Sequence, residues 1–150
     1  MMREILFKAK IKEWREQPEA NRWVEGSLYC DEFGHVFILP SYTNIGESYG
    51  GHWWIDDGMD RVDPKTVCQY TGLTDKNGVK IFENDIVRNC EEVSEMYVVK
   101  YYAHKGYPAF DCEPEMYYDC NGLSYLVEVM TSEVVGNIFD NPEMVERGVK

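Results

Sequence analysis

Four carboxylates gather within a short stretch near the middle of the sequence, directly after His52 and two tryptophans. The four carboxylates are Asp56, Asp57, Asp60 and Asp63, and the tryptophans are Trp53 and Trp54. Carboxylate oxygens are the ligands that hard cations prefer, so this acidic stretch is a candidate cation site for a small hydrolase or metal protein. A solvated acidic loop accounts for the same residues, and we favour that interpretation.

A second carboxylate, Asp75, opens a segment that starts like the calcium loop of an EF-hand. The pattern then fails, because Val79 falls at the third ligand position and Lys80 falls where such a loop requires glycine. Asn77-Gly78 is instead typical of a tight turn with positive φ, in which Asp75 accepts hydrogen bonds from the backbone that follows it. We therefore expect a turn here and no metal.

Nucleophiles and bases are present but fall in no recognisable catalytic pattern. The three histidines, His35, His52 and His104, lie far apart, and a pairing of Cys68 or Cys112 with His104 is left open. The sequence contains no HExxH motif, no nucleophile elbow and no phosphate-binding loop, since residues 46–51 are glycine-rich but lack the lysine and the following helix. We expect no enzyme, and we assign no catalytic, cofactor-binding or metal-binding residue.

Five cysteines occur at irregular spacing: Cys30, Cys68, Cys90, Cys112 and Cys120. No CxxC motif is present, so the spacing of a zinc knuckle or of a thioredoxin-type site is missing. Charged residues such as Arg3 and Glu4 interrupt the apolar stretches near the start of the sequence, and we expect no secretory signal. An odd number of cysteines without such a signal predicts reduced, mostly buried thiols in a cytoplasm.

The densest cationic feature is a stripe of three lysines, Lys8, Lys10 and Lys12, followed by Arg15. On a strand these lysines would share one face, about 6.5–7 Å apart. They could contact the phosphates of a nucleic acid, or they could protect an edge strand from aggregation, which is the interpretation we favour.

Aromatic residues concentrate in the C-terminal half. They are Tyr97, Tyr101, Tyr102, Tyr107, Phe110, Tyr117, Tyr118 and Tyr125. Exposed rings serve protein interfaces or stack on nucleic-acid bases. Acidic residues are interspersed in this segment, at Asp111, Glu113, Glu115 and Asp119. Their negative charge disfavours a polyanion such as nucleic acid as the binding partner. Protein recognition through this lobe is the first hypothesis, and it predicts weaker binding when Tyr101, Tyr107 and Tyr117 are changed.

Composition limits the class of protein. The 150 residues include 15 Lys or Arg and 27 Asp or Glu, a net charge of −12 that opposes direct binding to nucleic acid at long range. A hydrophobic content of 44% is ordinary for a globular domain, and no apolar run reaches the ~20 residues of a membrane span. We expect one soluble domain, and the same acidic surface could also imitate DNA toward a host enzyme.

Residues 5–11 show a period of two that predicts a strand, and further short apolar or β-prone segments between turn signals predict more strands. The predicted strands cover residues 5–11, 22–29, 36–39, 66–70, 79–82, 85–87, 96–102, 123–130 and 134–139. Residues 41–51 are typical of a loop, and Asn141-Pro142-Glu143 predicts the start of a short helix. The pattern favours a mainly β protein with antiparallel strands.

Three blocks of the sequence resemble the YopX family of phage and prophage proteins. The most specific is TVCQYTGLTDKNGVKIFENDIV at 66–87, and the flanking blocks are MREILFKAK at 2–10 and VVGNIFDNPE at 134–143. Asn84 departs from the family pattern, which usually has glycine before Asp-Ile-Val. Asn tolerates the left-handed backbone better than most residues, so we expect the turn to survive.

The resemblance implies a single YopX-like domain over residues 1–150, with an N-terminal β lobe over about 1–60 and a C-terminal lobe over about 61–150. The C-terminal lobe would be a small roll or barrel similar to Src-homology-3 domains. The resemblance also implies a phage or prophage gene expressed in a bacterium, and it implies no reaction. We therefore expect a non-enzymatic accessory protein that binds another protein or itself, with a nucleic-acid role as the alternative.

Overall fold

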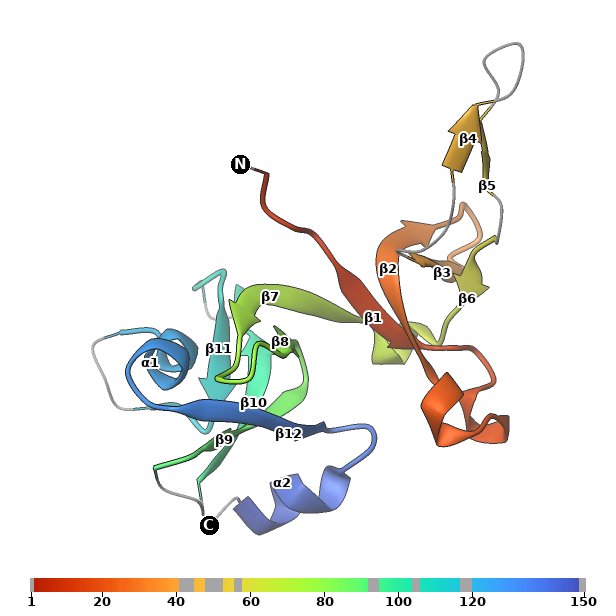
Figure 1. Ribbon diagram of the computed structural model, residues 1–150. Helices are drawn as coiled ribbons and strands as arrows, with labels where there is room; N and C mark the ends of the chain where they lie inside the picture. Colours follow the sequence, from red (N-terminus) through yellow and green to blue (C-terminus); the bar gives the residue numbers. More distant parts are fainter. Residues whose placement is uncertain are drawn as a thin grey trace. The chain divides into compact units, whose positions relative to one another are not determined.

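The computed structural model describes residues 2–40, 45–47, 53–55, 58–91, 95–103, 106–116 and 120–148. The chain forms two compact units, an N-terminal unit of Met2–Gln69 and a C-terminal unit of Tyr70–Lys150 (Figure 1). All strand pairs are antiparallel among these residues. The predicted mainly β, antiparallel fold is therefore confirmed.

The N-terminal unit is built on a curled sheet in the order β6-β3-β2-β1-β7. Its strands are β1 (Phe7–Lys10), β2 (Trp23–Cys30), β3 (Val36–Pro40), β6 (Asp60–Arg61) and the start of β7 (Cys68–Thr74), and β4 (Ile45–Glu47) pairs separately with β5 (Trp53–Ile55). Three single-turn 3-10 helices, η1 (Trp14–Glu16), η2 (Glu19–Asn21) and η3 (Pro64–Thr66), connect them. The sheet curls enough for Ile11 to form a bridge with Val62, and Ala9, Ile38 and Val62 form its small core.

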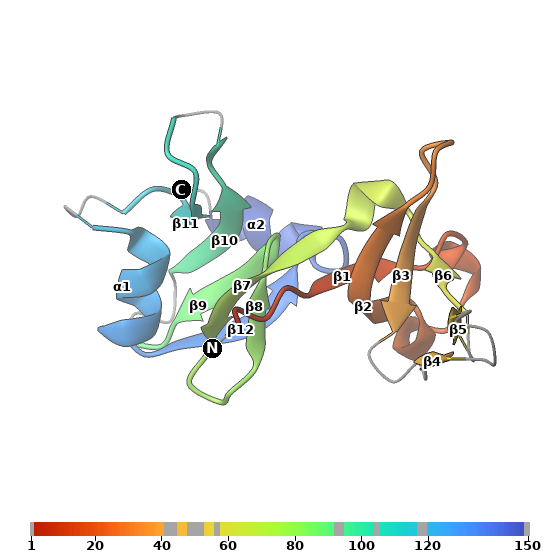
Figure 2. The same cartoon turned by 90° about the horizontal axis from the view of Figure 1, so that it is seen from above.

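The C-terminal unit contains a four-stranded sheet in the order β11-β10-β9-β12. Its strands are β9 (Asp85–Asn89), β10 (Met96–Tyr101), β11 (Phe110–Glu113) and β12 (Ser132–Asn137), while β8 (Lys80–Phe82) pairs with the continuing β7. Two helices, α1 (Gly122–Glu128) and α2 (Pro142–Gly148), complete the unit (Figure 2).

The two helices lie on opposite faces of this sheet because its buried residues alternate. Leu123 of α1 packs with Val87 and Val99 on one face. Met144 of α2 lies against Ile86 on the other face. The four-stranded sheet remains open, so no closed barrel forms among the described residues, and the predicted barrel-like closure of this lobe is not found there.

Three predictions about individual elements were wrong. Residues 123–130 do not form a strand, because the Asn121 side chain caps a helix by accepting a hydrogen bond from the Ser124 N–H at 2.8 Å. Part of the expected loop at 41–51 forms β4, which pairs with β5. The first strand is not an edge strand, since β1 pairs with β2 on one side and with β7 on the other.

Candidate functional site

The lysine stripe does not form a cationic surface. Lys10 is fully buried, and its ammonium lies 3.6 Å from the centre of the Trp14 ring and 5.4 Å from that of Trp23. Lys8 also lies over Trp23, at 5.2 Å, and Lys12 falls outside β1 in the following turn. The aromatic rings thus hold Lys8 and Lys10 by cation–π contact. Because β1 is an inner strand, the lysines do not protect an edge either.

Two of the carboxylates that were considered as cation ligands, Asp75 and Asp63, have structural partners. Asp75 is buried, and its two oxygens accept hydrogen bonds from the N–H groups of Asn77 (2.8 Å), Val79 (2.9 Å) and Val134 (2.9 Å). Asp63 caps η3 by accepting a hydrogen bond from the Lys65 N–H at 3.1 Å. The part of the chain that the structure describes contains no group of three or more side chains arranged to hold a metal. Asp56, Asp57 and His52 lie outside the described residues.

The proposed cysteine–histidine pairs involve buried sulfur atoms. Cys68 and Cys112 are both buried, and His104 lies outside the described residues. Burial raises the pKa of the Cys112 thiol to about 12, and both the negative charge of Asp111 and a hydrogen bond with Asp111 act in the same direction. A thiol in this state is a poor nucleophile at neutral pH.

The tyrosines of the C-terminal half divide between the interior and the surface. Tyr97 and Tyr102 are buried, and burial with neighbouring acidic charges raises the pKa of Tyr102 to about 12. Tyr101 is 44% exposed and Tyr107 is 45% exposed. The Tyr101 ring contacts Phe110 with 5.2 Å between centroids. Tyr125 is partly buried, and Tyr117 and Tyr118 lie outside the described residues.

A more continuous group of exposed and partly exposed rings lies on the β2–β3 hairpin, where the sequence alone did not indicate one. We name it the aromatic hairpin patch, and it consists of Tyr29, Phe33, His35 and Phe37. Phe33 is 76% exposed and Tyr29 is 51% exposed. Ring centroids lie 6.2 Å apart for Tyr29–Phe37, 6.5 Å for His35–Phe37 and 6.2 Å for Phe33–His35. Figure 2 shows the turn that carries Phe33 projecting beyond the neighbouring strands.

The turn that presents Phe33 is held by one carboxylate. Asp31 accepts hydrogen bonds from the N–H groups of Phe33 (3.0 Å) and His35 (2.7 Å), and its other oxygen lies 2.7 Å from Nδ1 of His35. Gly34 supplies the positive φ of 82° that the turn requires. Partial desolvation raises the pKa of Asp31, but the hydrogen bonds and charge of His35 outweigh it and place this pKa below its usual value. The patch is therefore exposed yet conformationally fixed.

A hollow of about 530 Å³ opens elsewhere in the N-terminal unit. Its lining includes the carboxylates of Glu25 and Asp60 and the amides of Gln17 and Asn21. Gln17, Asn21 and Glu25 are themselves exposed, so the hollow is a depression of the surface. It brings together no nucleophile with a base.

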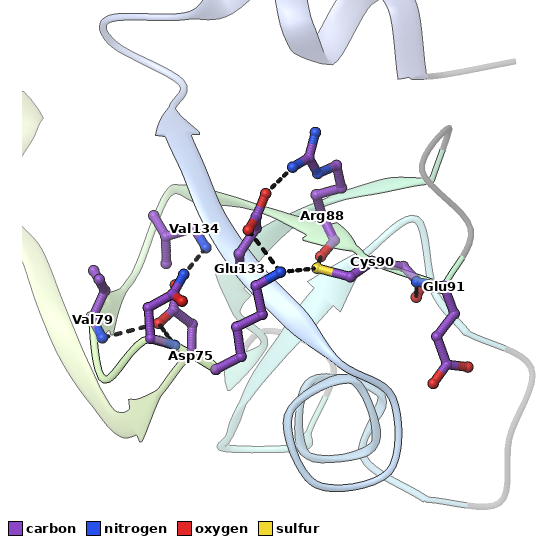
Figure 3. A network of polar contacts seen from close by, with 10 residues as sticks. Asp75, Val79, Arg88, Cys90, Glu91, Glu133 and Val134 are labelled. Atoms are coloured by element: carbon purple, nitrogen blue, oxygen red, sulfur yellow. Dashed lines mark hydrogen bonds and ion pairs between the residues drawn. The ribbon is translucent and has the colours of Figure 1, made fainter.

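A polar network joins the turn after β7 to β9 and β12 in the C-terminal unit (Figure 3). The Lys76 ammonium donates to Oε2 of Glu133 at 3.0 Å and to Sγ of Cys90 at 3.2 Å. Arg88 forms an ion pair with the other oxygen of Glu133. This arrangement places a primary amine in contact with both a thiol and a carboxylate, and no feature of the sequence indicated it.

Comparison with protein families gives a match to the YopX protein model over residues 13–146. The chain belongs to the YopX family. Protein EF1440 from Enterococcus faecalis, known from a crystal structure, has a similar fold with a TM-score of 0.59 and 23% sequence identity. The similarity covers 96% of this chain and 99% of that one. No curated protein matches the sequence.

The family-like segment at 66–87 acts as structure in this YopX chain. Gly72 and Gly78 have φ values of 91° and 77°, and Asp75 ties the turn between them to β12 through Val134. Asn84 has a φ of 66°, so the predicted survival of its turn is confirmed. None of the helices among the described residues has both the length and the apolar character to span a bilayer.

Proposed function

We propose that this YopX-family chain is a non-enzymatic protein-binding module of phage or prophage origin that acts in the bacterial cytoplasm. Its recognition surface is the aromatic hairpin patch. The observation that carries this proposal is a chain of four rings on one hairpin, in which Tyr29 neighbours Phe37, Phe37 neighbours His35 and His35 neighbours Phe33, with Phe33 76% exposed at the turn. Clustered, exposed aromatic side chains are enriched at protein interfaces and supply most of their binding energy.

The fixed geometry of the turn favours binding. Asp31 holds the backbone N–H groups of Phe33 and His35 and also contacts the His35 ring, so little conformational entropy is lost when a partner covers the Phe33 ring. A flexible loop with the same side chains would lose more conformational entropy on binding.

Charge indicates the chemistry of the partner. The exposed Glu32 and the carboxylate of Asp31 flank Phe33, and the whole chain carries a net charge of −12. A complementary surface has an apolar pocket for Phe33 with lysine or arginine around its rim. The partner is therefore a host or phage protein with a basic, aromatic-accepting pocket.

A differential pull-down tests the proposal. Tagged protein is incubated with bacterial lysate, with and without nuclease treatment, and retained proteins are quantified for the native chain, for Tyr29→Ser/Phe33→Ser and for Tyr101→Ser/Tyr107→Ser. The second double variant is the control, because it removes two exposed rings from the C-terminal unit, Tyr101 at 44% and Tyr107 at 45% exposure. We expect a partner that is lost with the hairpin variant and kept with the control.

Each other outcome counts against the proposal in its own way. If the partner is lost only with the Tyr101→Ser/Tyr107→Ser variant, the interface lies at the C-terminal tyrosines instead. Retention with both variants would leave neither surface as the interface. A partner removed by nuclease would favour the nucleic-acid alternative, for which the burial of Lys10 leaves no lysine stripe on the surface.

A further inference from the structure

Cys90 differs from the other cysteines of the described chain in its contact with a lysine that is also bound to a carboxylate. Its sulfur lies 3.2 Å from Nζ of Lys76, which lies 3.0 Å from Oε2 of Glu133 (Figure 3). We propose that Cys90 is a peroxide-sensitive modification site, and that Lys76 captures its oxidised sulfur in a covalent S–N bond.

Exposure makes the reaction possible at Cys90. Cys90 is partly exposed and the Lys76 side chain is 36% exposed, so a small oxidant reaches the sulfur. Cys68 and Cys112 are buried, whereas Cys30 and Cys120 are exposed. Within the described residues, neither Cys30 nor Cys120 has a lysine or arginine in contact with its sulfur. These two cysteines therefore serve as internal controls for exposure alone.

The first step is oxidation by hydrogen peroxide. The Cys90 thiolate attacks one oxygen of the peroxide and the O–O bond breaks, which gives a sulfenic acid, and the leaving hydroxide takes up the proton that the thiol lost and is released as water. The thiolate is the reacting form of cysteine, and the Lys76 ammonium at 3.2 Å is a partner for its negative charge. Sulfur is oxidised by two electrons, and the peroxide is reduced by the same two.

The second step is capture by the neighbouring amine. Lys76 transfers a proton to the Glu133 carboxylate, and its nitrogen lone pair attacks the sulfur of the sulfenic acid. The S–O bond breaks, the leaving hydroxide takes up a proton, and a second water is released. The sum is one thiol, one amine and one peroxide giving one S–N bond and two waters. The N···S separation of 3.2 Å lies within the range of a near-attack geometry, about 3–3.5 Å.

Backbone contacts hold the two reacting residues in place. The Lys76 N–H donates to the Ser132 carbonyl at 3.0 Å, and the Cys90 N–H donates to the Thr131 carbonyl at 2.8 Å. Both residues are thus anchored to the same dipeptide at the start of β12. Arg88 holds the other oxygen of Glu133, which positions that carboxylate toward Lys76. The bond would lock the turn after β7 to the end of β9.

The experiment is peptide mapping of the full chain after treatment with hydrogen peroxide. We expect a cross-linked peptide joining Lys76 and Cys90 whose mass is about 2 Da below the sum of its parts, with loss of tryptic cleavage after Lys76. Dithiothreitol should restore both free peptides, because a thiol attacks the sulfur of the S–N bond.

Three variants make the assignment specific. Lys76→Arg keeps the positive charge but removes the amine, and Cys90→Ser removes the sulfur; neither should give the cross-link. Glu133→Gln removes the base and should slow formation at least about tenfold. Circular dichroism of each variant confirms that it is folded.

Two results would overturn the proposal. One is oxidation of Cys90 no faster than that of Cys30 and Cys120, with no cross-link. The other is a cross-linked peptide that retains an oxygen atom, with a mass about 14 Da above the sum, because nitrogen would then not have attacked sulfur directly.

Discussion

Asp75 provides the sharpest test of how the family-like segment stabilises the fold. Asp75 is 7% exposed, and its carboxylate accepts three backbone hydrogen bonds, two within its own turn and one from Val134 on β12. Asp75→Ala leaves these three N–H groups without their acceptor. A hydrogen bond to a charged group contributes about 1.5–3 kcal/mol, and bonds that share one carboxylate do not add fully.

We therefore expect Asp75→Ala to lower the free energy of unfolding by about 3 kcal/mol or more. For a chain of this length that corresponds to a fall in Tm of roughly 6–12 °C. Asp75→Asn keeps an oxygen for the two bonds within the turn, but it turns an NH2 group toward the Val134 N–H. The loss of unfolding free energy for Asp75→Asn should be about half as large, and most of it should come from the broken contact with Val134 on β12.

The assay is urea unfolding followed by circular dichroism, together with hydrogen exchange of the Val134 amide. Exchange of this amide should accelerate in both variants. Glu128→Gln is the matched control, because it removes one negative charge from an exposed position. A loss below about 1 kcal/mol for Asp75→Ala, or equal losses for Asp75→Ala and Glu128→Gln, would refute the reasoning.

Three further predictions follow from single contacts. A Cβ at Gly26 would lie 1.9 Å from a backbone oxygen of β3, so Gly26→Ala should lower the free energy of unfolding by more than about 2 kcal/mol in urea titrations; an unchanged midpoint would contradict this. Cys112, with its pKa raised to about 12, should resist iodoacetamide at pH 8 in the folded chain while exposed Cys30 reacts, as mass spectrometry of the labelled peptides would show. The pKa of Asp31 is lowered in the folded chain, so its contribution to the hairpin is present above the unfolded pKa of about 3.9 and lost as pH falls through the folded value. An NMR titration of Asp31 and His35 measures this, and a titration of Asp31 at the unfolded value would exclude the effect.

Much of the strand framework could be predicted from local patterns. The period of two in residues 5–11 marked β1, the apolar segment at 96–102 marked β10, and Asn77-Gly78 marked the tight turn that follows β7. Helix α1 was missed because it is only seven residues long. Its signal was present, since Leu123, Leu126, Val127 and Met130 follow helical spacing after the capping Asn121.

The candidate site was harder to predict because its residues meet only through pairing. Tyr29 and Phe37 become neighbours through the register of β2 with β3, and neither is distinctive in the sequence. The turn signal at Asp31 and Gly34 was visible, and the rings on both sides of it could have indicated the patch. The sequence pattern predicted that Lys10 is a surface cation. That prediction missed the two tryptophans that cover it, because they come from other elements, η1 and β2.

The affinity of the captured partner for two forms of the chain tests the central claim most directly. Once the partner is purified, its Kd is measured by titration calorimetry for the native chain and for Phe33→Ser. Removal of a central aromatic contact should weaken binding at least about tenfold, the effect of a hot-spot residue, while Tyr107→Ser leaves the Kd unchanged. An equal Kd for the native chain and Phe33→Ser would contradict recognition through the aromatic hairpin patch.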